Sequence, residues 1–258
     1  MRIAVVTGAA QGLGRTTAEH LGRLGYRLWL TDLKPLERQC EELRASGVDA
    51  EGLSGDVSCE AFVRALDEKV HARDGAADVL VNNAGISLIA PAEATSAAEW
   101  QQVMNVNLFG PFLLCRYLGA RMLERRGGSI VNVASIAGLT AITHRSAYNA
   151  SKHGLIGLTR TLAAEWGGRG VRVNAVCPGW IKTEMDAADQ GRGAYTDRDI
   201  VDRVPMARFA RAQDVAAAIA FLADPERSAF INGASLPVDG GWLADGSWEQ
   251  LRQKTRTP

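Results

Sequence analysis

Residues 3–14 read IAVVTGAAQGLG, an apolar run that leads directly into a turn with three glycines. Gly8 permits a tight turn because it has no Cβ, Gly12 lets the backbone approach an anion, and Gly14 lets a following helix pack closely on the strand. The free N–H groups at the start of that helix carry a partial positive charge, which favours a bound anion. This stretch therefore predicts a strand–turn–helix unit that holds a pyrophosphate.

Short apolar runs and longer amphipathic segments alternate along the rest of the chain. Alternation of this kind is typical of βαβ units. It predicts an α/β fold, a Rossmann-type doubly wound parallel sheet of about seven strands with helices on both faces. The predicted strands are 3–6, 27–31, 49–54, 78–81, 129–134, 171–176 and 235–238, and the predicted helices lie near 12–25, 34–46, 59–73, 96–126, 148–167 and 212–223.

No linker, repeat or low-complexity segment divides the chain, so residues 1–258 are expected to form one nucleotide-binding domain. Residues 180–205 differ from the rest because they are polar, with four basic and six acidic side chains. Long irregular segments in a domain are usually binding loops, so this one is expected to form a substrate lid. The polar tail 246–258 is expected on the surface or on a partner subunit.

Charge and cysteine content exclude several classes of protein. The chain has 29 basic and 29 acidic residues, so no basic excess favours nucleic acid or a membrane as partner. Its four cysteines and four histidines show no metal-ligand spacing, and no metal is expected. The first residues enter a strand without signal-peptide features. The protein is therefore expected in the cytoplasm.

The carboxylate of Asp32 closes the second predicted strand. A carboxylate there can accept hydrogen bonds from an adenosine ribose and would repel a 2′-phosphate, so NAD is predicted in preference to NADP. The NADP alternative stays open because two cations, Arg15 and Lys34, are close in sequence. A structural glycine turn beside a solvated aspartate is the alternative to cofactor binding.

Further motifs follow one another in a fixed order. They are Asp56-Val57, Asn82-Asn83-Ala84-Gly85, Asn107 within Asn105-Val106-Asn107-Leu108-Phe109-Gly110, Ser135, Tyr148 with Lys152 four residues later, Pro178-Gly179, Thr183, and Asn232-Gly233 with Val238-Asp239-Gly240-Gly241. Together with the TGxxxGxG spacing of residues 7–14, the series resembles the short-chain dehydrogenase/reductase superfamily over nearly the whole chain. The three-residue gap between Gly8 and Gly12 argues against its epimerase branch.

The resemblance implies a cofactor site assembled from the glycine turn, an adenine-contacting pair and a segment that holds the nicotinamide. The residues implied are Gly8, Gln11, Gly12, Leu13, Gly14, Asp32, Asp56, Val57, Asn83, Ala84, Gly85, Tyr148, Lys152, Pro178, Gly179, Ile181 and Thr183. Asn82 is expected to tie neighbouring strands together and to line the cofactor cleft. Helices over 108–123 and 147–162 are implied to pack between subunits of a homotetramer, or at least a dimer.

The chemistry of Tyr148 and its neighbours can be argued without the family. Reducing a ketone with hydride needs a proton donor at the new alkoxide, and a tyrosine hydroxyl has a pKa of about 10 until a cation stabilises its phenolate. Lys152 lies one helical turn away on the same face, and Ser135 can donate to the substrate oxygen. Tyr148 is therefore predicted to be the general acid and base that interconverts a secondary alcohol and a ketone, with hydride carried by the cofactor. The resemblance adds Asn107, which would hold a water behind Lys152.

The identity of the alcohol is not indicated by the sequence. Residues that stand beside the motifs are candidates for contacting it: Ser87, Ala137, His144, Trp180 and Met185, with Arg145 next to His144. The alternative enzyme is an NADPH-dependent 3-oxoacyl thioester reductase. The alternative outside enzymes is a nucleotide-sensing regulatory protein, for which a proton donor at position 148 would be unnecessary.

Overall fold

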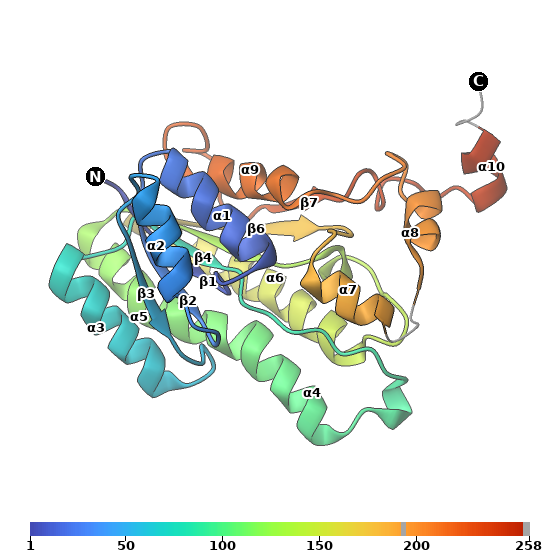
Figure 1. The fold of residues 1–258 in the computed structure, drawn as a ribbon, viewed down its shortest axis with the longest axis horizontal. Helices are drawn as coiled ribbons and strands as arrows, with labels where there is room; N and C mark the ends of the chain where they lie inside the picture. Colours follow the sequence, from blue (N-terminus) through green and yellow to red (C-terminus); the bar gives the residue numbers. More distant parts are fainter. Residues whose placement is uncertain (192–194, 255–258) are drawn as a thin grey trace.

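The computed structural model describes residues 1–191 and 195–254, and over these residues the chain forms a parallel sheet flanked by helices (Figure 1). The seven strands lie in the order β3-β2-β1-β4-β5-β6-β7, each parallel to its neighbours. Their bounds are β1 Ile3–Thr7, β2 Arg27–Asp32, β3 Ala50–Ser54, β4 Val79–Asn82, β5 Gly128–Val133, β6 Val171–Pro178 and β7 Ser235–Val238. The predicted fold class is confirmed, and each predicted strand end lies within two residues of the observed one.

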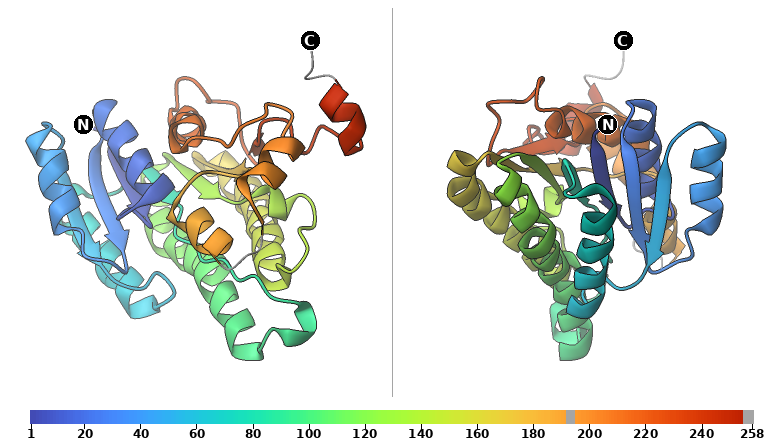
Figure 2. Two further views of the ribbon diagram at one scale, coloured as in Figure 1. Left: turned by 45° about the vertical axis from the view of Figure 1, so that its right-hand side comes forward. Right: turned by 90° about the vertical axis from the view of Figure 1, so that its left-hand side faces the viewer.

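Helices cover both faces of the sheet (Figure 2). The α-helices are α1 Gly12–Arg23, α2 Glu37–Ala45, α3 Glu60–Asp74, α4 Ala97–Met104, α5 Gly110–Arg125, α6 Ser146–Trp166, α7 Glu184–Gly191, α8 Asp197–Arg203, α9 Ala212–Ala223 and α10 Glu249–Lys254. Short 3₁₀ turns lie at η1 Ala92–Ala94, η3 Ile136–Gly138 and η4 Gly167–Arg169. Helices α1, α2 and α9 contribute to the core on one face, and α3, α5 and α6 to the core on the other.

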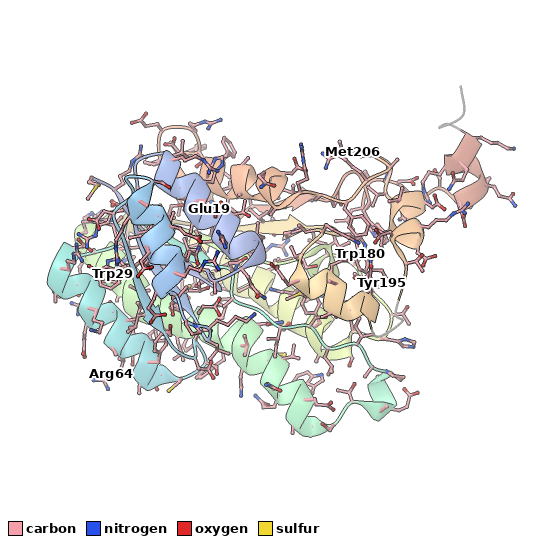
Figure 3. The ribbon with its side chains drawn as sticks, viewed as in Figure 1. Glu19, Trp29, Arg64, Trp180, Tyr195 and Met206 are labelled. Carbon is pink, nitrogen blue, oxygen red and sulfur yellow. The ribbon has the colours of Figure 1, made fainter. Side chains whose placement is uncertain are left out.

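The two cores follow from the alternation of side chains along each strand. In β1 the side chains of Ala4 and Val6 enter the first core and that of Val5 enters the second. Because both faces are buried, the strands are apolar throughout, as parallel sheets require. In β2, Trp29 faces α3 (Figure 3) and donates from Nε1 to Asp74 Oδ2 at 2.7 Å.

The segment predicted as one helix over 96–126 is instead three consecutive pieces. Helix α4 ends at Met104, a π-helix spans Asn105–Phe109, and α5 begins at Gly110. A π-helix adds a residue to one turn, so it redirects side chains without ending the helix. Here it turns Asn107 into the interior, where its side chain is fully buried.

The predicted lid is more regular than expected. Helices α7 and α8 lie within 180–205, where irregular chain was predicted, and α10 lies within the polar tail 246–258. Thr196 caps α8 in a capping box with Asp199, which explains how so polar a segment starts a helix. Residues 192–194 of the lid and 255–258 of the tail lie outside the described residues. No helix over 1–191 or 195–254 is long and apolar enough to cross a membrane.

A chain of buried polar side chains links the centre of the sheet to α6. Asn82 donates to Asn132 Oδ1 at 2.7 Å, and Asn132 donates to Thr159 Oγ1 at 2.8 Å. Thr159 in turn donates to the carbonyl of Leu155 at 2.7 Å. The expectation that Asn82 ties strands together is therefore confirmed: Asn82 is in β4, Asn132 in β5 and Thr159 in α6.

Replacing Thr159 with Val should lower the free energy of unfolding by about 1–3 kcal/mol, because the buried amide of Asn132 loses its acceptor. The matched control is Thr161→Val on the same helix, whose exposed hydroxyl bonds only to the carbonyl of Gly157. That change should alter stability by less than about 0.5 kcal/mol. Urea denaturation measures the free energy of unfolding of both variants. Equal losses in the two would contradict a stabilising role for the Asn132–Thr159 hydrogen bond.

Candidate active site

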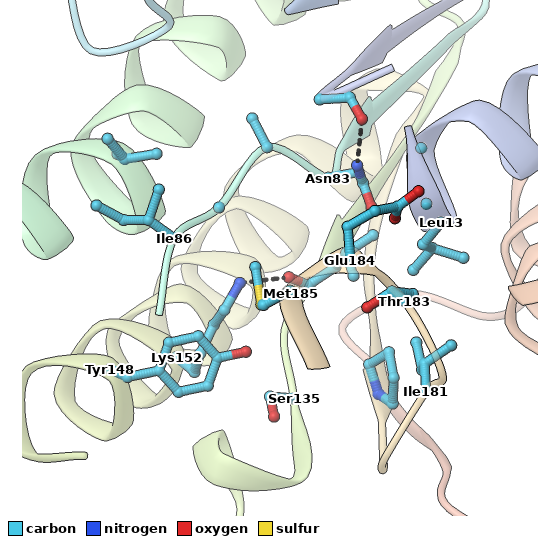
Figure 4. A pocket seen from close by; sticks show the side chains of 18 of the residues that line it. Leu13, Asn83, Ile86, Ser135, Tyr148, Lys152, Ile181, Thr183, Glu184 and Met185 are labelled. Carbon is cyan, nitrogen blue, oxygen red and sulfur yellow. Dashed lines mark hydrogen bonds between the residues drawn. The ribbon is translucent and has the colours of Figure 1, made fainter. Parts of the chain in front are cut away.

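A cavity of about 740 Å³ opens where the carboxyl ends of β1, β2, β4, β5 and β6 meet the lid (Figure 4). The strand order reverses between β1 and β4, and open α/β sheets bind ligands at such a switch point. Every residue predicted to contact the cofactor lines this cavity. Three of the four predicted catalytic residues, Ser135, Tyr148 and Lys152, line it as well.

The glycine turn has the backbone that an approaching phosphate requires. Gly8 and Gly12 adopt positive φ angles of 63° and 53°, which side chains other than glycine rarely adopt. A Cβ on Gly14 would lie 2.0 Å from the carbonyl oxygen of Gly8, so no larger residue fits there. The N-terminus of α1 thus stands directly against the end of β1, and the site suits a dinucleotide pyrophosphate.

Hydrogen bonds from β4 hold this turn in place. Thr7 Oγ1 accepts from the backbone N–H groups of Asn83 and Ala84 at 3.0 and 2.9 Å. The side-chain amide of Asn83 donates to the carbonyls of Thr7 and Gly8 at 2.9 and 3.1 Å. The expectation that Asn82 also lines the cofactor cleft is wrong, because its side chain is turned toward Asn132 and is not among the lining residues.

Asp32 stands at the ribose end of the cavity with both carboxylate oxygens engaged. Oδ2 accepts from the backbone N–H of Ala10 at 3.0 Å, and Oδ1 accepts from that of Lys34 at 2.9 Å. The nearby cations are paired: Lys34 donates to the side chain of Gln11, and Arg15 contacts Glu19 and Glu42 at 2.9 and 2.7 Å. The acidic side chain of Asp32 is therefore oriented by the backbone, while both cations have other partners.

Tyr148, Ser135 and Lys152 come together from two elements at the far end of the cavity (Figure 4). Burial raises the pKa of Tyr148, and a hydrogen bond with Ser135 and the charge of Arg145 lower it in part. Lys152 donates to the carbonyl of Val133 at 2.8 Å, with Nζ 5.6 Å from the Tyr148 ring centre. Burial lowers the pKa of Lys152 to about 8.

The expected lowering of the Tyr148 pKa by Lys152 is not what the structure shows. The cation that lowers it is Arg145, whose guanidinium carbon lies 5.9 Å from the Tyr148 ring centre. Lys152 is held instead by the end of β5. The spacing of four residues does bring the two side chains to one face of α6, with Lys152 Nζ 5.6 Å from the Tyr148 ring centre.

Asn107 lies behind the cavity wall rather than on it. Its Nδ2 donates to the carbonyl of Ile86 and to Ser151 Oγ at 3.0 and 3.1 Å, and its Oδ1 accepts from the Ile86 N–H at 2.9 Å. A Cβ on Gly85 would lie 3.3 Å from Asn107 Oδ1 and 3.6 Å from Lys152 Nζ. Asn107 and Lys152 therefore flank the same glycine.

Only two of the five predicted substrate residues, Trp180 and Met185, line the cavity. His144 is exposed, because a β-bridge pairs its neighbour Arg145 with Ala90 and His144 takes a positive φ of 61°. Its side chain therefore points outward and that of Arg145 inward. Ala137 is fully buried beneath Ser135, to which its N–H donates at 3.1 Å. Ser87 does not line the cavity, and its hydroxyl accepts a hydrogen bond from Arg145 at 2.7 Å.

The lid supplies lining residues that the sequence reasoning missed. These are Glu184, Asp186, Asp189 and Tyr195. Asp186 and Asp189 are both buried, although α7 is otherwise largely exposed. Their spacing of three places them on one face of a helix, and this was the signal available in the sequence. Tyr195 packs edge-on against Trp180, with ring centres 4.6 Å apart (Figure 3).

Comparison with known proteins agrees with this geometry. A family model described as enoyl-(acyl carrier protein) reductase matches residues 8–243. A D-threitol dehydrogenase from Mycolicibacterium smegmatis is 42% identical over 93% of this chain and 92% of its own. A 3-oxoacyl-[acyl-carrier-protein] reductase from Staphylococcus aureus is 35% identical over 92% of this chain and 96% of its own.

A solved structure is similar over almost all of both chains. A gluconate 5-dehydrogenase from Burkholderia cenocepacia, in complex with NADP and tartrate, has a TM-score of 0.89 and 33% sequence identity. The similarity covers 95% of this chain and 96% of that one. An NAD(P)-binding fold is therefore common to both.

Affinity for the reduced nicotinamide cofactor, NADH or NADPH, should fall as the pH rises through about 8. Below that pH Lys152 carries its proton and attracts the anionic cofactor, and above its pKa of about 8 the charge is lost. Between pH 7 and 9.5 the dissociation constant should rise roughly ten- to thirtyfold, as measured by NADH fluorescence. The Lys152→Met variant should bind the cofactor weakly, and its dissociation constant should not change near pH 8. The same change of dissociation constant in that variant would rule out Lys152 as its source.

Proposed function

The chain belongs to the short-chain dehydrogenase/reductase family, and we propose that it interconverts a secondary alcohol and a ketone with NAD(H), with Tyr148 as general acid and base. The observation that carries this proposal is the meeting of Tyr148, Ser135 and Lys152 at one end of a cavity whose other end holds the glycine turn and Asp32. As a family member the chain is an oxidoreductase acting on CH–OH groups.

The residues divide the chemistry at the substrate oxygen between them. The bound cofactor supplies the hydride donor or acceptor and, when oxidised, a positive ring charge. Ser135 donates a hydrogen bond to the substrate oxygen, and Tyr148 gives that oxygen a proton in reduction and takes it back in oxidation. Both side chains are fixed before substrate arrives, so little reorganisation is needed.

The pKa of Tyr148 bears on the two directions differently. Lowering a tyrosine pKa from about 10 to about 7 needs roughly 4 kcal/mol of preferential phenolate stabilisation. Here burial raises the pKa, and the charge of Arg145 is opposed by Asp189. The chain's own groups therefore keep Tyr148 protonated at neutral pH, which suits ketone reduction, while alcohol oxidation depends on further positive charge in the complex.

Lys152 and Asn107 have supporting roles in this proposal. Lys152 would hydrogen-bond the nicotinamide ribose, and Thr183 would contact the carboxamide. Asn107, fixed by Ile86 and Ser151, would hold a water behind Lys152 through which the proton of Tyr148 could reach solvent. The π-helix supports this role because it brings Asn107 next to Gly85.

NAD(H) is the proposed cofactor, although the gluconate 5-dehydrogenase neighbour was solved with NADP. Asp32 supports NAD(H) because its carboxylate would repel a 2′-phosphate. Arg15 and Lys34 would have to give up Glu19, Glu42 and Gln11 to bind that phosphate. An NADPH-dependent 3-oxoacyl thioester reductase is the alternative, because a relative is named a 3-oxoacyl-[acyl-carrier-protein] reductase.

The proposal extends to domain organisation, assembly and location. Residues 1–258 form one domain, with a lid at 180–205 and a tail at 246–258.

Apolar side chains stand exposed on α4 and around the start of α5, where Trp100, Phe109 and Phe112 are 37%, 44% and 41% accessible. Such a surface suits a subunit contact, so a homotetramer or dimer is proposed. The cytoplasm is the proposed location.

Replacing Tyr148 with Phe tests the proposed reaction. It removes the proton donor and keeps the ring, so kcat should fall roughly 10²- to 10⁴-fold while NADH binding stays within threefold of the wild type. Stopped-flow or steady-state NADH absorbance measures kcat, and fluorescence titration measures the affinity for NADH. Turnover that survives the change would exclude Tyr148 as the acid, and no turnover of any alcohol by the wild type would favour the nucleotide sensor.

Asp32→Asn tests the cofactor preference. Wild-type enzyme should show kcat/KM for NAD⁺ at least tenfold above that for NADP⁺, and the neutral variant should reduce this ratio roughly ten- to hundredfold by removing charge repulsion. Glu41→Gln, an exposed change on α2 outside the cavity, should leave the ratio unaltered. A wild-type preference for NADP⁺ would overturn the assignment.

A further inference from the structure

Three side chains from distant parts of the chain meet at the substrate end of the cavity. Arg145 and Asp189 are 7% and 6% exposed, and their charged groups lie 3.0 Å apart. Ser87 Oγ accepts from Arg145 at 2.7 Å and donates to Asp189 at 3.3 Å. We call Ser87, Arg145 and Asp189 the clasp, because it joins the loop after β4, the start of α6 and the lid helix α7.

The clasp stands next to the catalytic tyrosine. The guanidinium carbon of Arg145 lies 5.9 Å from the Tyr148 ring centre and 5.5 Å from that of Trp180. Both Arg145 and Asp189 line the cavity, so a substrate whose oxygen bonds to Tyr148 would have its next carbons beside them. Well-packed apolar residues usually stabilise an interior as well as a buried ion pair does, so this pair at the cavity wall is better explained by binding than by stability.

The clasp has hydrogen-bonding capacity left for a ligand. Arg145 uses Nη1 for Ser87 and Nη2 for Asp189, and Asp189 uses Oδ2 for both partners. Over the described residues, no protein group accepts from Arg145 Nε or donates to Asp189 Oδ1. A donor and an acceptor are thus offered side by side. Neighbouring hydroxyl groups satisfy such a pair because each is both donor and acceptor.

Charge at this end of the cavity favours a neutral ligand. Asp186, also buried, accepts from Tyr195 Oη at 2.8 Å and lies 3.3 Å from Lys182 Nζ. Arg145 pairs with Asp189, and Lys182 contacts both Asp186 and Asp197, so each buried carboxylate has a cation beside it and neither cation is left over for an anionic ligand. An anionic substrate would face two carboxylates and would have to displace Asp189 from Arg145. An apolar alcohol would desolvate both charged groups and return no hydrogen bond.

From these contacts we propose that the substrate is a small neutral polyhydroxy alcohol, or its ketose, and that Arg145 and Asp189 select it by binding the hydroxyl next to the reacting carbon. The proposal rests on the alcohol–ketone function proposed above. Met185 and Ile142 supply the apolar wall for the carbon chain. A short chain is required because the same cavity must also hold the cofactor.

A series of four-carbon substrates tests the selection without changing chain length. Butan-2-ol has no second hydroxyl, butane-2,3-diol has one, threitol has a hydroxyl on every carbon, and 3-hydroxybutyrate carries a charge. We expect kcat/KM of the wild type to rise at least tenfold from butan-2-ol to the diol, to be highest for threitol, and to be lowest for 3-hydroxybutyrate. Loss of one hydrogen bond in a site built for it typically has effects of this size.

Two variants then assign the selection to the clasp. Arg145→Met keeps much of the side-chain length and should reduce the threitol-to-butan-2-ol ratio of kcat/KM at least tenfold, chiefly through KM for threitol. Asp189→Asn removes the charge that holds the Arg145 guanidinium. It should raise the ratio of kcat/KM for 3-hydroxybutyrate to kcat/KM for threitol at least fivefold. Arg198→Met is the matched control, because the Arg198 side chain is 89% exposed on α8, and it should leave both ratios unchanged. NADH titration confirms that each variant is folded.

The possible results separate this proposal from the function on which it rests. If kcat/KM for butan-2-ol equals or exceeds that for threitol, and turnover still depends on Tyr148, the proposed substrate class is wrong and the alcohol–ketone function is retained. A preference of the wild type for 3-hydroxybutyrate overturns the neutral class. An equal loss on all four substrates in Arg145→Met shows that the clasp only holds the lid, and overturns the selection. No turnover of any substrate despite NADH binding contradicts the function itself.

Discussion

The first helix can approach the first strand only because Gly14 carries no side chain. Its missing Cβ would otherwise stand 2.0 Å from the carbonyl of Gly8. This close approach places the N-terminus of α1 at the edge of the sheet where β1 and β4 separate, and Asn83 then ties β4 to the same turn. The hydrogen bonds between the parallel strands hold the remaining parts of the site, from Asp32 to Lys152, at fixed positions relative to the N-terminus of α1.

Burial acts on the two titrating groups of the catalytic helix in opposite directions. It raises the pKa of Tyr148 and lowers that of Lys152, because a buried site disfavours the charged form of each. At neutral pH Tyr148 therefore keeps its proton, while Lys152, with a pKa of about 8, still carries its charge but loses it at a lower pH than an exposed lysine would. The protein thus keeps a proton donor and a cation on the same helix, and the cofactor and substrate complete the electrostatics.

Local patterns predict the sheet and the cofactor end of the cavity well. The strands are visible because their apolar runs are continuous, and the glycine turn is visible because its backbone requires glycine at fixed spacings. The substrate end depends on contacts that no local pattern contains. Ser87 and Asp189 are 102 residues apart. His144 and Arg145 were both candidates to face the substrate, but only Arg145 lines the cavity, and the positive φ of His144 that separates the two has no signal in the sequence. The π-helix was missed because its residues also suit an ordinary helix.

That π-helix has a consequence for how the chain can vary in length. Each residue of an α-helix turns the next by about 100°. The π-helix Asn105–Phe109 takes one more residue into its turn than an α-helix would, so α5 keeps almost the same phase relative to α4 as in an uninterrupted α-helix. Leu113 and Leu118, each 1% exposed, would therefore stay in the core if this segment were one residue shorter. The contact of Asn107 with Ser151 would be lost, because regular winding would move Asn107 to another side of the helix. A deletion here would thus affect the position of one buried amide more than the packing of the fold.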